Sequence, residues 1–61
     1  MSTLNETKNT LTDLMDTIDD SIYLMDTRFE YTAEYITDLI EVKAMFVTLR
    51  NKLEKTYKKI K

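Results

Sequence analysis

The sequence predicts an all-α protein: an antiparallel helical hairpin, with helices over about 3–25 and 28–60, that dimerises into a four-helix bundle. Three observations lead to this prediction. The 61 residues include no glycine and no proline, so the residues that break helices are absent. Eight of the nine residues spaced at sevens from Leu4 to Ile60 are apolar, which is typical of helices that pack on helices. A single domain this short gains little stability from its own core, so association between copies is expected.

The first helix is predicted from its start signal and from a narrow apolar seam. Residues 3–6, Thr-Leu-Asn-Glu, have the S/T-x-x-E form of a capping box. When the Leu4 series is labelled d of a heptad, Met15, Ile22 and Phe29 fall at position a. Between residues 11 and 29 the apolar residues therefore follow the a/d spacing of a two-stranded contact.

The second helix is predicted from another capping box, Thr27-Arg28-Phe29-Glu30, which places its start at residue 28. An ordinary mid-helix threonine is the other interpretation of Thr27. In that case the d series, which keeps its phase through Ile60, favours one continuous helix in a coiled coil. The hairpin is preferred because a single long helix would leave part of the apolar surface outside a two-stranded interface.

The apolar stripe widens in the second half of the chain. From Tyr35 onwards it uses positions g and d, and Ile40 and Val47 broaden it further. A broad stripe suits a helix with more than one neighbour, so one flank is expected to meet the other helix and the other flank a second copy. The predicted oligomer interface consists of Leu11, Met15, Ile18, Ile22, Met25, Phe29, Tyr35, Ile36, Leu39, Val42, Phe46, Leu49 and Leu53.

Charge is divided between the two ends of the chain, although the net charge is only −2. Residues 1–31 hold seven acids and two bases, whereas residues 43–61 hold seven bases and one acid. Three explanations fit this division: favourable helix-dipole interactions, pairing of the two halves in an antiparallel arrangement, and an anion-binding patch at the basic end.

The composition excludes most catalytic chemistry, and we expect a non-enzymatic protein without metal or cofactor. Histidine and cysteine are both absent, so no hydroxyl nucleophile has its usual activating base and no cysteine or histidine metal site is possible. Glu34, Asp38 and Glu41 lie on outer heptad positions and are interpreted as a solvated face. Lys43 is interpreted as a residue that extends its amine from the edge of an interface.

Nucleic-acid binding by the basic end is the alternative function. A small helical-hairpin dimer can bind RNA, as Rop-type plasmid regulators do, and the similarity to Rop is one of architecture and length. Salt-sensitive phosphate contacts and stacking on a tyrosine ring are the chemistry that this end offers. The candidate residues are Arg50, Lys52, Lys55, Tyr57, Lys58, Lys59 and Lys61.

The preferred function is a protein–protein interaction module, such as an adaptor, an inhibitor or an assembly factor, with all 61 residues forming one domain. Its partners are expected to be itself and an unidentified protein. Tyr23 and Tyr31 fall on outer heptad positions and are candidates for contact with that protein. We expect it in the cytoplasm, or the host cytoplasm if viral, with no membrane: the longest uncharged run is Ala44–Leu49, and residues 1–20 contain no apolar block.

Overall fold

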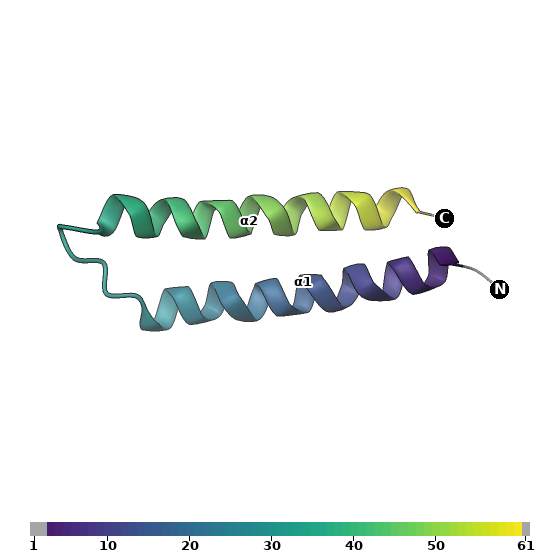
Figure 1. The fold of residues 1–61 in the computed structure, drawn as a ribbon, viewed down its shortest axis with the longest axis horizontal. Helices are drawn as coiled ribbons and strands as arrows, with labels where there is room; N and C mark the ends of the chain where they lie inside the picture. Colours follow the sequence, from purple (N-terminus) through teal and green to yellow (C-terminus); the bar gives the residue numbers. More distant parts are fainter. Residues whose placement is uncertain (1–2, 61) are drawn as a thin grey trace.

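The fold is an antiparallel helical hairpin. The computed structural model describes residues 3–60, without the side chain of Thr3. Helix α1 (Thr3–Arg28) and helix α2 (Ile36–Lys59) lie side by side, and residues 29–35 connect them. The start of α1 and the end of α2 lie at the same end of a slender body of 52 × 16 × 12 Å (Figure 1). The predicted all-helical hairpin is confirmed, and the alternative of one continuous helix is wrong.

The threonines of α1 are accommodated by hydrogen bonds within the helix. Hydroxyl groups on its exposed surface donate to the backbone carbonyl four residues earlier, at 2.9–3.1 Å. Such bonds satisfy the hydroxyl without a tertiary partner, although they give the helix no extra stability. The side chains that do this are Thr10, Thr12, Thr17, Ser21 and Thr27.

The predicted start of the second helix at residue 28 is wrong. Thr27 belongs to α1, and its hydroxyl donates to the carbonyl of Tyr23 at 2.9 Å instead of capping a following helix. Helix α2 begins at Ile36, after Tyr35, whose side chain makes no capping hydrogen bond. The capping box predicted at residues 3–6 depends on the side chain of Thr3, which lies outside the described part of the chain.

Replacing Thr27 with alanine tests the position of this boundary. Thr27 lies in the last turn of α1, and a hydroxyl that donates to a carbonyl of its own helix adds little to stability. T27A is therefore expected to change the free energy of unfolding by less than about 0.5 kcal/mol. A true N-cap would lose about 1 kcal/mol on the same change. Urea unfolding followed by circular dichroism measures the difference, and a loss of the larger size would contradict the boundary described above.

The chain turns at residues 29–35 without glycine or proline. The amide of Phe29 donates to the carbonyl of Met25 at 3.2 Å, and the ring of Tyr31 then packs edge-on against Phe29, with ring centroids 6.0 Å apart. A helix continuing through this segment would place Glu30, Glu34 and Asp38 four residues apart on one face, where like charges repel. The turn avoids that repulsion and brings the apolar seams of the two helices together.

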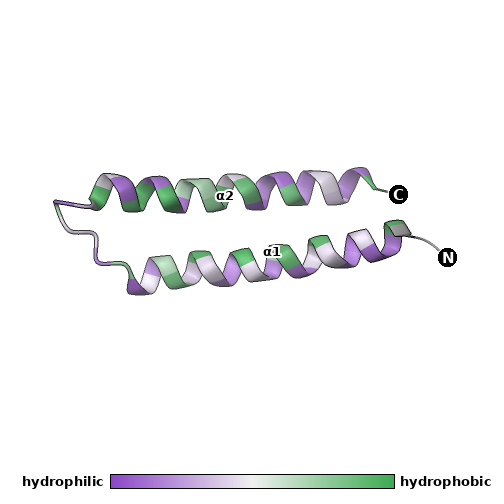
Figure 2. Ribbon diagram, in the orientation of Figure 1, coloured by the Kyte–Doolittle hydropathy of each residue, from purple (hydrophilic) through white to green (hydrophobic). Residues whose placement is uncertain are grey.

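The core lies along positions a and d of both helices. Among residues 4–60, only Ile18 and Met25 are buried, at 7% and 6% exposure. The seam of α2 differs from the predicted g/d stripe, because Lys43 and Arg50, at position a, are half-buried. Figure 2 shows that apolar residues are concentrated in the first part of α2, whereas its last turns are mostly hydrophilic. A seam this thin leaves much of the apolar surface uncovered.

Candidate protein-interaction surface

One long side of the hairpin is held by ion pairs between the helices. Lys43 Nζ lies 2.5 Å from Asp26 Oδ1, and Arg50 Nε lies 3.1 Å from Asp19 Oδ1. The Arg50 guanidinium also bonds Glu54 Oε2 at 2.6 Å along α2. Asp19, Asp26 and Glu54 all occupy position e, and in an antiparallel helix pair the two e positions flank the same side of the seam. We call this the ion-paired side.

These contacts agree with the pairing explanation for the divided charge, because acids of α1 meet bases of α2. The hydrogen bond to Asp26, reinforced by the charge of that carboxylate, raises the pKa of Lys43 above its ordinary value of 10.5. The hydrogen bond from Arg50 to Asp19, with the same carboxylate charge, likewise raises the pKa of the guanidinium. Ion pairs this exposed contribute little stability, but they define which sides of the helices meet.

The raised pKa of Lys43 predicts a pH dependence of stability. The lysine gains its partner on folding, so its contribution is complete below 10.5 and is lost as the pH rises through the raised value. A Lys43→Arg variant keeps its positive charge in that range. We therefore expect the Tm of the wild-type protein to fall relative to that of K43R between pH 10 and pH 12. The two proteins differ only at residue 43, so parallel Tm curves would contradict the predicted role of the pair.

The opposite side of the seam carries no charge along most of its length. Its flanking g positions include Leu14 and Ser21 on α1 and Val42, Leu49 and Thr56 on α2. The three aliphatic side chains among them are exposed by 38–49%. We call this the uncharged side.

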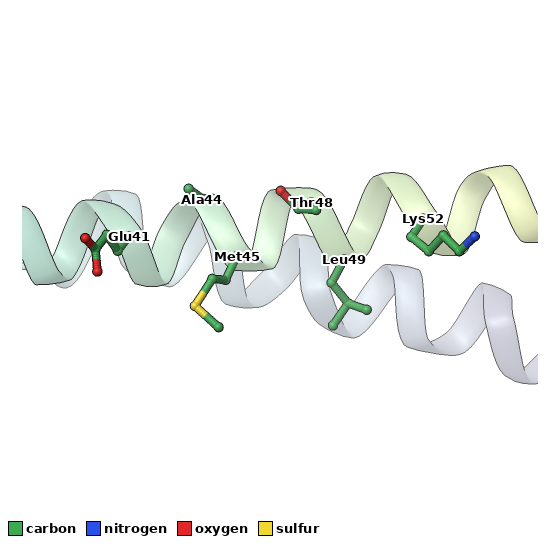
Figure 3. A pocket seen from close by; sticks show the side chains of 6 residues that line it. All are labelled: Glu41, Ala44, Met45, Thr48, Leu49 and Lys52. Atoms are coloured by element: carbon green, nitrogen blue, oxygen red, sulfur yellow. The ribbon is translucent and has the colours of Figure 1, made fainter.

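An open hollow lies next to the uncharged side, on the outer surface of α2 (Figure 3). Its six lining residues recur with helical spacing on this one helix. Five of them occupy the outer positions b, c and f, and Leu49 occupies position g beside the seam that Phe46 and Leu53 share with α1. Met45 and Leu49 project from it, and Met45 is 70% exposed. We call this surface the α2 stripe; it consists of Glu41, Ala44, Met45, Thr48, Leu49 and Lys52.

No protein-family model, curated protein or solved structure was found to match this chain.

Most of the predicted oligomer interface is used inside the hairpin itself. Nine of its thirteen residues are buried or half-buried in the described monomer: Leu11, Met15, Ile18, Ile22, Met25, Phe29, Leu39, Phe46 and Leu53. The other four, Tyr35, Ile36, Val42 and Leu49, are exposed. The prediction missed Met45 as a surface residue, although its outer heptad position, c, was a signal in the sequence that it could project from the back of α2.

The predicted nucleic-acid residues divide into two groups. Arg50 is engaged by Asp19 and Glu54, and Tyr57 is half-buried beneath the amine of Lys8, which lies 4.8 Å from its ring centroid. Neither side chain is therefore presented freely to a nucleic acid. Lys52, Lys55, Lys58 and Lys59 are exposed, with the Lys58 amine 3.5 Å from Glu54, and Lys61 lies outside the described residues.

The two candidate partner-contact tyrosines differ in their surroundings. Tyr23 is 67% exposed on the outer surface of α1. Tyr31 packs against Phe29, and its hydroxyl lies 3.5 Å from the carbonyl of Met25, at the outer limit of a hydrogen bond. Tyr31 thus helps to close the turn, and Tyr23 is the more accessible of the two.

Within residues 3–60, neither helix has the length and apolar character needed to cross a bilayer. Within the same range, acidic side chains do not gather in groups of three or more that could hold a metal ion.

Proposed function

We propose that this protein is a non-enzymatic, cytoplasmic protein–protein interaction module that works as a homodimer. The observation that carries the proposal is the imbalance between its core and its surface. Two side chains are buried, while twelve large hydrophobic side chains of the described residues are exposed. An apolar surface on that scale marks an interaction site in a small protein.

The size of the chain supports the same proposal. A helical hairpin with so thin a seam has little stability of its own, and the chain has no cysteine or histidine to reinforce it with a disulfide or a zinc site. Association covers apolar surface and stabilises the folded state through mass action. A homodimer would still leave Tyr23 and the far side of α1 open to a different protein.

Sedimentation equilibrium tests self-association directly. We expect a mass of twice 7.3 kDa at tens of micromolar protein, with a Tm that rises with protein concentration. A folded species of 7.3 kDa at every concentration, with a constant Tm, would refute the proposal.

The alternative is a nucleic-acid-binding regulator, and one observation favours it: Lys52, Lys55 and Lys59 are exposed on the outer surface of α2. Their phosphate contacts would give affinity for RNA that falls steeply with salt. Binding of a fluorescent RNA duplex at 50 and 200 mM salt tests this function. Affinity that drops by about tenfold or more supports it, and no binding at 50 mM excludes it.

A further inference from the structure

The α2 stripe is complementary to itself when two copies run antiparallel. Its acid, Glu41, lies at one end and its base, Lys52, at the other, about 16 Å apart along the helix, with apolar residues between them. In the described chain neither side chain takes part in an ion pair within the hairpin. A two-fold axis at the level of Phe46 and Val47 would bring each acid opposite the base of the other copy.

The uncharged residues between Glu41 and Lys52 fit the same two-fold axis. In that register Met45 lies opposite Thr48 of the second copy, so a large side chain meets a small one. Leu49, at position g, lies on the same flank as Leu49 of the second copy, so these two side chains can extend the apolar contact. Met45 and Leu49 are exposed by 70% and 49% in the hairpin. The charged ends and the apolar middle of the α2 stripe are therefore compatible with one and the same antiparallel register.

The charges just beyond the α2 stripe continue the pattern. Asp38 lies one turn before Glu41, and Lys55 lies one turn after Lys52. Both are exposed, and they face each other across the same axis. A parallel arrangement would instead place Lys52 beside Lys52 and Glu41 beside Glu41, where like charges repel.

The outer face of α1 is a poor site for a second copy. Between Glu6 and Asp20 its outer heptad positions carry acids and uncharged polar residues, and its exposed apolar residues, Tyr23 and Leu24, lie only near its last turn. Two such acidic faces would repel each other, and a contact between α1 and α2 would have charge complementarity with apolar contact at one end only. The α2 stripe offers both kinds of contact at once.

We propose that two copies of this protein dimerise through the α2 stripe, antiparallel, with Glu41 of each copy paired to Lys52 of the other. This inference rests on the proposed function, since it specifies which surface makes the homodimer. The contact is isologous: each copy contributes the same residues, so the assembly closes at two chains.

Charge reversal at the two ends of the stripe tests the geometry. Glu41→Lys places two lysines opposite each other in the homodimer, and Lys52→Glu places two glutamates opposite each other. Each variant is expected to raise the dimer Kd by about tenfold or more at low salt. An equimolar mixture of the two should form a heterodimer with a Kd near the wild-type value, because both ion pairs are restored with reversed sign. The double variant should dimerise like the wild type for the same reason.

The controls separate folding from association. Both substituted residues are exposed, so circular dichroism at high protein concentration should show unchanged helicity in each variant. Asp20→Lys, which changes the charge by the same amount on the outer face of α1, should leave the dimer Kd unchanged. High salt should weaken the effect of each reversal, because exposed charges are screened.

Sedimentation equilibrium distinguishes the outcomes. If the wild type dimerises but the mixture shows no recovery, another face makes the dimer, and this inference fails while the proposed function stands. If the wild type is monomeric throughout, both fail. Assemblies larger than a dimer, which keep growing with protein concentration, would indicate a contact between two different faces of the protein. Such a result would also overturn the inference.

Discussion

Replacing Ile18 with aspartate is expected to unfold the hairpin. Ile18 is one of two buried side chains and lies at the middle of α1. A carboxylate at that position loses the apolar contacts and has no buried cation to pair with, at a cost of at least about 3 kcal/mol. That is comparable to the whole stability expected of so small a core. We expect I18D to lose most of its helical circular dichroism signal at low micromolar concentration.

The matched control is Leu24→Asp in the same helix. Leu24 is 45% exposed, and an aspartate there has Arg28 four residues away to balance the repulsion from Asp20. L24D should therefore retain its helicity. Equal losses in I18D and L24D would mean that the apolar seam contributes no more than the outer surface, contrary to the core described here.

Replacing Phe46 with aspartate is expected to have an effect nearly as large, from the other helix. Phe46 is half-buried at position d of α2, on the face turned towards α1. Truncating a large aromatic side chain and placing a charge beside the apolar seam costs on the order of 3 kcal/mol. We expect F46D to separate the helices, with loss of helicity and of any dimer, since a dimer depends on folded α2.

The neighbouring residue supplies the control. Val47 occupies position e and is 38% exposed, and an aspartate there lies close to the cationic Lys43 and Arg50. V47D should leave the urea midpoint within the range expected of a surface change, about 0.5 kcal/mol. If F46D keeps the helicity and mass of the wild type while V47D unfolds, the assignment of faces on α2 is reversed.

The first helix was largely predictable. Between residues 11 and 29 six apolar residues fall at a and d, and only Leu14, Tyr23 and Leu24 fall elsewhere, so the a/d face of α1 is the one expected to be buried. The burial of Ile18 and Met25 follows from that pattern. The antiparallel pairing of charges could also be anticipated, because acids and bases are separated along the chain before any folding.

The turn was harder to place. The capping box at Thr27 has the right residues, but its hydroxyl can equally well donate to the carbonyl of Tyr23 within a helix. Nothing in the local sequence decides between the two uses. The turn lies at residues 29–35 because Phe29 still packs at the end of the seam and Tyr31 closes over it.

By itself the sequence determined the all-helical class, the buried face of α1 and the sign of charge on each half of the chain, and it favoured two helices over one. These depend on helix propensity and on spacing, which are local. Only the tertiary structure decided which face of α2 meets α1, because α2 has two overlapping apolar stripes. The a/d face was selected, since there Lys43 and Arg50 reach Asp26 and Asp19 across the seam. That choice turned Met45 and Leu49 outwards and so exposed the α2 stripe.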